Sequence, residues 1–179
     1  MTELTKGSKI KKPKVVNNLI IVRGLPGSGK STVAGLFNGP DVFKASTDDW
    51  FVKMDGKYRF NPADLEDNHK ACIQWYKDKV DNRNKSKNGI TIVIHNTFTK
   101  YWELYPYVEY IKNKKSFLLT VLDVFDGGLS DKELFLRNIH GVPKEKIEEM
   151  RENLESSKWC KKRYKFYVEG REAQGERWA

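Results

Sequence analysis

The fold of this chain is decided by a stretch near its N-terminus, Gly24-Leu25-Pro26-Gly27-Ser28-Gly29-Lys30-Ser31. The stretch fits the pattern GxxxxGK[ST], in which glycines let the backbone curl its N–H groups inward around a phosphate. Lys30 would bring a positive charge to the β- and γ-phosphates, and Ser31 would offer a hydroxyl to Mg²⁺. The sequence therefore predicts a P-loop that binds a nucleoside triphosphate through Gly24, Pro26, Gly27, Ser28, Gly29, Lys30, Ser31 and Thr32.

The segments on either side of this loop agree with the prediction. An apolar run at residues 19–22 precedes the loop, as a buried strand would, and residues 32–37 can form a helix. The N-terminus of that helix would point at the phosphates. A glycine-rich turn that binds nothing is the alternative, but such a turn does not require a strand, a lysine and a hydroxyl in register.

Length and composition indicate one folded domain in a reducing compartment. The chain has 179 residues, enough for a single domain with a normal core. No apolar run reaches the roughly 18 residues of a membrane span, and the N-terminus lacks the apolar segment of a signal peptide. Two cysteines make no disulfide framework. We therefore expect a cytoplasmic protein, in the host cytoplasm if the chain is viral, that does not bind a membrane.

The formal net charge of +9 directs attention to two basic segments. Residues 1–17 contain five lysines and one glutamate, and we expect them to form a flexible basic arm. The second segment holds basic and aromatic residues without an acid, namely Lys158, Trp159, Lys161, Lys162, Arg163, Tyr164, Lys165, Phe166 and Tyr167. Such a mixture can follow a phosphate backbone and stack on bases. It is equally compatible with a last strand at residues 164–168 that has solvated lysines before it.

The order of the expected elements predicts an α/β fold. Strands are expected at residues 19–22, 42–46, 90–94 and 117–124. Helices are expected at residues 32–37, from Pro62 onward, at 101–112, from Asp131 onward and from Pro143 onward, and a hairpin is expected at 51–60. Because strands and helices alternate, the sheet should be parallel and flanked by helices. We interpret residues 18–179 as one domain, with a helical lid at about 130–157.

The acidic pair Asp48-Asp49 is the best indication of a reaction. It follows the second expected strand, and the carboxyl ends of parallel strands form the active crevice. A carboxylate there can accept the proton of a hydroxyl that attacks the γ-phosphate. One of the two aspartates could instead cap a turn.

Arg137, on an expected lid helix, is the second candidate for catalysis. A lid arginine can neutralise the charge that develops on the phosphates during transfer. The alternative is that Arg137 only complements the dipole at the end of its helix. The residue pattern alone does not decide between these two roles.

Several motifs beyond the P-loop recur in this order in one family. They are Ser46-Thr47-Asp48-Asp49-Trp50-Phe51, Asp55-Gly56-Lys57-Tyr58, Asn96-Thr97, Leu136-Arg137-Asn138 and His140-Gly141-Val142-Pro143. On these residues the chain resembles the P-loop polynucleotide kinases, the end-healing kinases of phage type. Within that group it is most similar to the kinase-like domain of Nedd-type ubiquitin-ligase-binding proteins. The resemblance extends from about residue 19 to about residue 157.

This resemblance implies a P-loop kinase fold and transfer of the γ-phosphate of ATP to a 5′-hydroxyl of DNA or RNA. It implies that Lys30 and Ser31 keep their P-loop roles and that Asp48 is the general base. Arg137 would be the lid arginine. ATP, Mg²⁺ and the 5′ ends of nucleic acids are the implied cofactors and partners, whereas the oligomeric state stays open.

The chain departs from the family pattern at two positions. His95 stands where the third expected strand should end in an acid, and Phe51 stands where a basic residue tends to follow the acidic pair. The two changes can belong together, because the missing acid and base could otherwise interact. His95 could hydrogen-bond the substrate, and we expect Asp49, His95, Asn96 and Thr97 on the acceptor side of the site.

The other two histidines are weaker signals. His69 lies on the apolar face of its expected helix, which favours a packing role, and His140 could simply shape the turn between the lid helices. None of the histidines or cysteines shows the spacing of metal ligands.

Two further functions remain open. One is a kinase of a nucleotide or other small metabolite, although a small substrate needs no extended basic surface. The other is a nucleic-acid-binding protein with a residual kinase fold, which His95 would favour.

Overall fold

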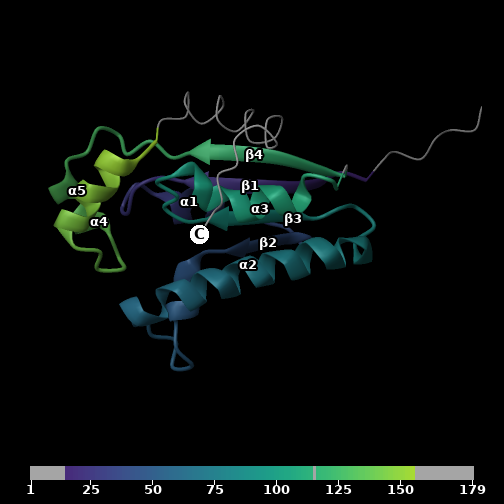
Figure 1. The fold of residues 1–179 in the computed structure, drawn as a ribbon, viewed down its shortest axis with the longest axis horizontal. Coiled ribbons are helices and arrows are strands. Elements are labelled where there is room, and N and C mark those ends of the chain that lie inside the picture. Colours follow the sequence, from purple (N-terminus) through teal and green to yellow (C-terminus); the bar gives the residue numbers. More distant parts are fainter. Residues whose placement is uncertain (1–14, 115, 156–179) are drawn as a thin grey trace, which may run out of the picture.

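The computed structural model describes residues 15–114 and 116–155 (Figure 1). Its strands are β1 (Asn17–Arg23), β2 (Val42–Ala45), β3 (Thr91–His95) and β4 (Phe117–Asp123). They form one sheet in the order β2-β3-β1-β4, and every neighbouring pair is parallel. The described residues also form the helices α1 (Lys30–Gly35), α2 (Leu65–Asp81), α3 (Tyr105–Ile111), α4 (Asp131–Arg137) and α5 (Lys144–Asn153). The predicted α/β fold with a parallel sheet is therefore confirmed.

Two of the predicted segments cannot be compared with this structure. Residues 1–14 of the expected basic arm lie outside the described residues, and so does the basic and aromatic cluster at 158–167.

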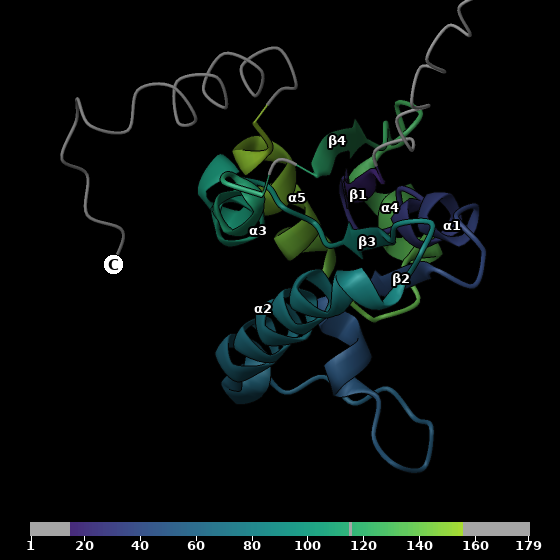
Figure 2. The same ribbon diagram turned by 90° about the vertical axis from the view of Figure 1, so that its right-hand side faces the viewer.

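β1 lies inside the sheet and is covered on both faces, which explains its uninterrupted apolar sequence. Leu19 and Ile21 are fully buried in a cluster that includes side chains of α2 and α3. Ile20 and Val22 point to the opposite face, where they pack with Ala34 of α1. Figure 2 shows this arrangement, with α1 on one side of the sheet and α2 and α3 on the other.

The helices α4 and α5 lie at the carboxyl ends of the strands, toward which the arrowhead of β4 points in Figure 1. A capping box begins α4, because the Ser130 hydroxyl accepts the Glu133 N–H and the Glu133 carboxylate accepts the Ser130 N–H. Leu134 of α4 and Ile147 of α5 are fully buried together with Leu25 of the P-loop. These two helices therefore pack on the predicted phosphate-binding loop.

β1 begins two residues earlier than predicted, at Asn17. The Asn17 side-chain amide donates to Ser116 Oγ (3.2 Å), and its oxygen accepts the backbone N–H of Ile90 (2.9 Å). Asn17 is only 3% exposed, so these bonds fix it within the fold. It belongs to the sheet and not to the arm predicted for residues 1–17.

Three further elements differ from the expectation in their details. β2 ends at Ala45, because Ser46 caps a 3₁₀ helix at Thr47–Phe51. The expected hairpin at residues 51–60 is reduced to an isolated antiparallel bridge between Val52 and Tyr58. The helix expected at 101–112 begins as a 3₁₀ turn, and its proline lies in the first turn of α3, where no helical hydrogen bond needs its missing N–H.

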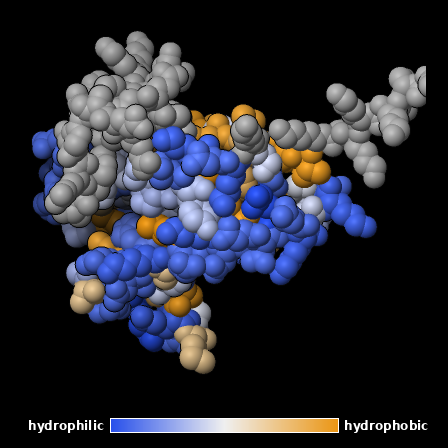
Figure 3. All heavy atoms as spheres, turned by 45° about the vertical axis from the view of Figure 1, so that its right-hand side comes forward, coloured by the Kyte–Doolittle hydropathy of each residue, from blue (hydrophilic) through white to orange (hydrophobic). Residues whose placement is uncertain are grey.

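One face of the molecule is mostly polar (Figure 3). On the face drawn in Figure 3, hydrophilic residues predominate and apolar ones appear in small separate groups. None of the helices formed by the described residues combines the length and the apolar composition that a membrane span requires.

Arg23, the last residue of β1, is buried at the start of the P-loop and is 1% exposed. Its guanidinium donates to the backbone oxygens of Phe98 (2.9 Å), Thr99 (3.2 Å) and Glu155 (3.0 Å). The same group lies 3.3 Å from a carboxylate oxygen of Asp123 at the end of β4. One cation therefore ties the loop after β3 and the segment after α5 to the strand that carries the P-loop.

We expect Arg23→Met to lower the free energy of unfolding by about 3 kcal/mol, because the side chain would leave several buried polar groups without their donor. Asp123→Asn is the matched control and should cost less than about 1 kcal/mol, since the Asp123 side chain is 38% exposed. Urea unfolding followed by circular dichroism measures both values. If both substitutions lowered the free energy of unfolding by the same small amount, Arg23 would not be the residue that holds these segments together.

Candidate phosphoryl-transfer site

The P-loop connects the end of β1 to α1, and two of its glycines are required by the geometry. Gly27 has φ of 77°, a conformation that disfavours side chains, and a Cβ there would lie 2.3 Å from the backbone oxygen of Leu134 in α4. A Cβ on Gly24 would lie 2.8 Å from the backbone oxygen of Val124. The loop is thus held between the end of β4 and α4, at distances that only glycine allows.

Lys30, at the beginning of α1, lies across its own loop. Its Nζ donates to the backbone oxygen of Leu25 at 2.9 Å. Burial lowers the pKa of Lys30 from 10.5 to about 8, while the negative charge of Asp48 opposes that shift. The influence of Asp48 on this pKa indicates that the lysine and the acid belong to one site.

Ser28 Oγ is buried and has no hydrogen-bond partner within the described part of the chain. A buried hydroxyl without a partner inside a glycine-rich loop fits the presence of a phosphate oxygen beside it.

Ser31, the predicted magnesium contact, is exposed on the first turn of α1, as is Thr32. Residues 15–114 and 116–155 contain no group of three or more acidic, histidine or cysteine side chains that could hold a metal.

The two aspartates after β2 have different surroundings. The Asp49 carboxylate accepts the backbone N–H of Ser46 at 2.8 Å, which completes a capping box at the 3₁₀ helix. Asp49 was expected on the acceptor side, but this bond gives it the capping role. The Asp48 side chain is 43% exposed and points to groups from two other segments. Tyr58 Oη donates to Asp48 Oδ1 at 3.1 Å, and His140 Nε2 lies 3.7 Å from Asp48 Oδ2.

Asn96 and Thr97, which follow β3, brace the site. Asn96 is buried, and its side-chain oxygen accepts the Ser46 hydroxyl (3.1 Å) and the Thr47 N–H (2.8 Å). The backbone oxygen of Thr97 accepts the N–H of Gly24 at 3.2 Å. The Asn96 oxygen thus holds the acidic turn, and the Thr97 backbone holds the start of the P-loop. The Asn96 side-chain nitrogen is buried and has no hydrogen-bond partner among the described residues, so a contact of Asn96 with the acceptor stays a prediction.

His95, in place of the expected acid, is a neutral group between two charges. Burial lowers the pKa of its imidazole, the charge of Asp49 opposes this, and the charge of Lys30 adds to it. Phe51, in place of the expected basic residue, is 1% exposed and packs against Tyr58 with ring centroids 5.9 Å apart. At these two positions an imidazole therefore stands in place of the acid, and an aromatic contact stands in place of the basic residue.

All three histidines of the chain surround the acidic turn, although sequence reasoning singled out only one of them. His69 Nδ1 lies 3.1 Å from Thr47 Oγ1, so its packing position on α2 also brings it to the turn. His140 reaches Asp48 directly. The contact made by Tyr58 was missed as well. Tyr58 and His140 lie within motifs of the family resemblance, and this was the available signal for both.

Arg137 lies in the last turn of α4, and its side chain is exposed. Leu134, three residues earlier, is the residue whose backbone lies on Gly27 of the P-loop. Residues three apart share one face of a helix. Arg137 therefore lies about one turn beyond the residue whose backbone contacts the P-loop.

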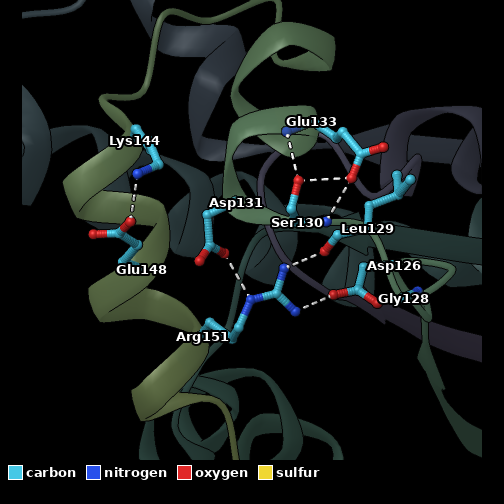
Figure 4. A network of polar contacts seen from close by, with 9 residues as sticks. All are labelled: Asp126, Gly128, Leu129, Ser130, Asp131, Glu133, Lys144, Glu148 and Arg151. Carbon is cyan, nitrogen blue, oxygen red and sulfur yellow. Dashed lines mark hydrogen bonds and ion pairs between the residues drawn. The ribbon is translucent and has the colours of Figure 1, made fainter.

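A network around Arg151 joins the two lid helices (Figure 4). Arg151 Nε donates to Asp131 Oδ1 at 2.7 Å, its Nη1 bonds to Asp126, and its Nη2 donates to the backbone oxygen of Leu129 at 2.8 Å. Asp131 is the first residue of α4, and the other two partners precede it. The segment that leads from β4 into α4 is thus fastened to α5, so the two helices are held as one unit.

Comparison with known proteins places the chain in a family. Residues 19–156 match the family described as AAA domain. The human protein NEDD4-binding protein 2 is 38% identical over 143 residues, which are 75% of this chain and 7% of that protein. The chain therefore corresponds to a small part of this relative.

Two solved structures share the fold. The structure of the Pnkp1/Rnl/Hen1 RNA repair complex contains a chain with a TM-score of 0.58 at 21% identity, covering 87% of this chain and 49% of that chain. A second Pnkp1/Rnl/Hen1 complex gives a TM-score of 0.50 at 23% identity, covering 70% of this chain and 40% of that one. At these identities the likeness concerns the fold.

The lowered pKa of Lys30 predicts that ATP binding weakens at alkaline pH. Above pH 8 the free lysine loses its proton, whereas a bound triphosphate favours the charged form and raises the pKa. The affinity should fall by up to about tenfold per pH unit from pH 8 upward. Calorimetric titration with MgATP between pH 7 and pH 9.5 measures this dependence, with Lys30→Met as the control that should lack it. If the affinity of the unmodified protein for MgATP stayed constant over this pH range, Lys30 would not be the group that binds the phosphates.

Proposed function

Because the chain belongs to the AAA domain family and carries a P-loop beneath a pair of helices, we propose that it is an ATP-dependent kinase of polynucleotide 5′-hydroxyl ends. The observation that carries the proposal is Asp48. It is a half-exposed carboxylate at the carboxyl end of β2, and its charge acts on the P-loop lysine. This is the arrangement that phosphoryl transfer to a hydroxyl requires.

In the proposed reaction the acceptor oxygen attacks the γ-phosphorus of ATP, and Asp48 takes the hydroxyl proton. The bond between the γ-phosphorus and the β–γ bridging oxygen breaks, and ADP leaves. Lys30 and the P-loop N–H groups hold the phosphates, with the Ser28 hydroxyl as a further donor. Mg²⁺, held by Ser31, would neutralise charge on the β- and γ-phosphates.

Arg137 is proposed as the cation that the lid brings to the transferring phosphate. Its place on α4, about one turn after Leu134, supports this role. An exposed guanidinium in that position can reach negative charge that develops on the phosphate oxygens. The alternative role at the helix dipole does not need the contact between α4 and the P-loop.

A nucleic-acid acceptor is favoured by charge and by the family motifs. The chain carries a formal net charge of +9, and such an excess attracts a polyanion more than a small metabolite. The motifs around Asp48, Tyr58 and Arg137 are those on which the chain resembles polynucleotide kinases. One structural relative is part of an RNA repair complex, which is a reason to test RNA ends beside DNA ends.

The neutral His95 favours a second candidate, a nucleic-acid-binding protein with a weakened kinase site. The position that the family pattern gives to an acid has no negative charge here, so the carboxylate that would contact the surroundings of a bound Mg²⁺ is missing.

Transfer of labelled γ-phosphate from ATP to 5′-hydroxyl DNA, 5′-hydroxyl RNA and a nucleoside 3′-monophosphate separates the candidates. The proposed kinase prefers the polynucleotides, whereas binding of oligonucleotides without any transfer would favour the second candidate. Equal efficiency on the monophosphate would favour a small-molecule kinase.

Asp48→Asn should lower kcat for the polynucleotide by about 10²–10⁴-fold and leave the Kd of ATP unchanged, because a base acts in the chemical step. Asp49→Asn is the matched comparison. It should lower the melting temperature through the lost cap and reduce kcat less. Steady-state kinetics with thermal unfolding measures both. A larger kcat loss for the Asp49 variant would show that the wrong carboxylate has been chosen.

Arg137→Ala should lower kcat by about 10²-fold with an unchanged melting temperature, because its exposed side chain contributes little to folding. Arg137→Lys should lie between this variant and the unmodified protein, since the charge remains but the planar fork is lost. Lys132→Ala, in the exposed first turn of the same helix, is the control and should leave kcat unchanged. Equal losses in the Arg137→Ala and Lys132→Ala variants would argue against a role in transfer.

A further inference from the structure

Three segments that are distant in sequence meet at Asp48. Tyr58, from the loop after the 3₁₀ helix, donates to one carboxylate oxygen, and His140, from the loop between α4 and α5, lies beside the other. The rings of Tyr58 and His140 also pack on each other, with centroids 4.6 Å apart. The two side chains therefore form one aromatic pair with a polar atom of each directed at the acid.

Tyr58 is a fixed donor and not a second acid in this arrangement. Burial raises its pKa far above the usual value, and the neighbouring charge of Asp48 raises it further. The phenol therefore keeps its proton throughout the neutral range. Its ring is held by the edge of Phe51 on one side and by His140 on another.

The loop that carries His140 is closed by Asn138. The side-chain oxygen of Asn138 accepts the backbone N–H of His140 (3.0 Å), and its amide donates to the backbone oxygen of Val142 (3.1 Å). Gly141 has φ of 70°, which allows the tight turn between these two bonds. Asn138 thus fixes the direction in which the loop presents the imidazole.

This loop belongs to the same helical unit that contacts the P-loop. Leu134 of α4 lies on Gly27, and the Arg151 network fastens α4 to α5. One rigid unit thus reaches the phosphate-binding loop through Leu134 and the acid through His140. Asp48 also accepts hydrogen bonds from Tyr58 Oη and, at 3.5 Å, from Ser46 Oγ. Because its side chain is 43% exposed, the contact with His140 adds a restraint that comes from this helical unit.

We propose that His140 is a positioning residue for Asp48, so that packing of the lid on the P-loop and orientation of the acid are one event. This inference rests on the proposed function of Asp48 as the base. Tyr58 holds Oδ1 from one side and His140 restrains Oδ2 from the lid side, which fixes the plane of the carboxylate toward an acceptor hydroxyl. A base held in one orientation transfers a proton faster than one that rotates.

Kinetics of His140 variants tests the proposal. His140→Ala should lower kcat about tenfold without changing the Kd of ATP, a loss in the usual range for residues that orient a functional group. His140→Gln, whose amide nitrogen can take the place of Nε2 beside Asp48, should recover most of the activity. Ile139→Ala is the matched control, because Ile139 is 84% exposed in the same loop. A fall in ATP affinity that equals the fall in kcat, or failure of His140→Gln to recover activity, would overturn the proposal.

A double-mutant cycle then separates positioning from an independent role. If His140 acts through Asp48, His140→Ala should have little further effect in a protein that already carries Asp48→Asn. Additive losses would overturn the proposal.

A spectroscopic measurement keeps the inference independent of the acceptor. In protein labelled with ¹³C-carboxyl aspartate, His140→Ala should shift the Asp48 resonance and Ile139→Ala should not. If no acceptor is phosphorylated but the resonance shifts, the proposed function fails and the positioning contact stands. A resonance that the His140 substitution leaves unmoved would overturn the positioning role itself.

Discussion

The close approach of Leu134 to Gly27 is the constraint on which the candidate site depends. A Cβ at position 27 would lie only 2.3 Å from the Leu134 backbone oxygen, so the lid helix rests directly on the backbone of the P-loop. Leu25, Leu134 and Ile147 bury one another around this contact. Because α4 is held there, the loop after it has a defined place relative to the P-loop and brings His140 to Asp48. Gly27, a glycine that sequence patterns associate with phosphate binding, thus also allows α4 to pack on the loop.

The polar side chains of the site differ in whether their oxygens brace the acidic turn. Asn96 and Asp49 use their oxygens to hold the acidic turn. Asp48 and Arg137 keep exposed side chains beside this bracing. Rigid support next to exposed charge is what a transfer site needs, since orientation must be fixed before the substrate arrives.

Sequence reasoning predicted the sheet and the P-loop because both rest on local patterns. The apolar run of β1, the glycines and Lys30 are adjacent in the chain, and the boundaries differ by only one or two residues. It failed where contacts join distant segments. His140 was interpreted as a turn residue, because nothing in the spacing of α4 and α5 says that their loop docks on Asp48. Arg23 was not noticed at all, since its partners lie 75 or more residues away.

The pairing of β1 has a consequence for how the chain folds. The strand that ends in the P-loop pairs with residues far ahead of it, for example Asn18 with Thr91 and Asn17 with Phe117. Such non-local parallel pairs form slowly, because a long loop must close before any contact stabilises it. During synthesis, β1 leaves the ribosome long before either neighbouring strand exists. The phosphate-binding loop therefore acquires its shape late, when β4 has emerged, and a chain that stops before residue 117 leaves one edge of β1 without a partner.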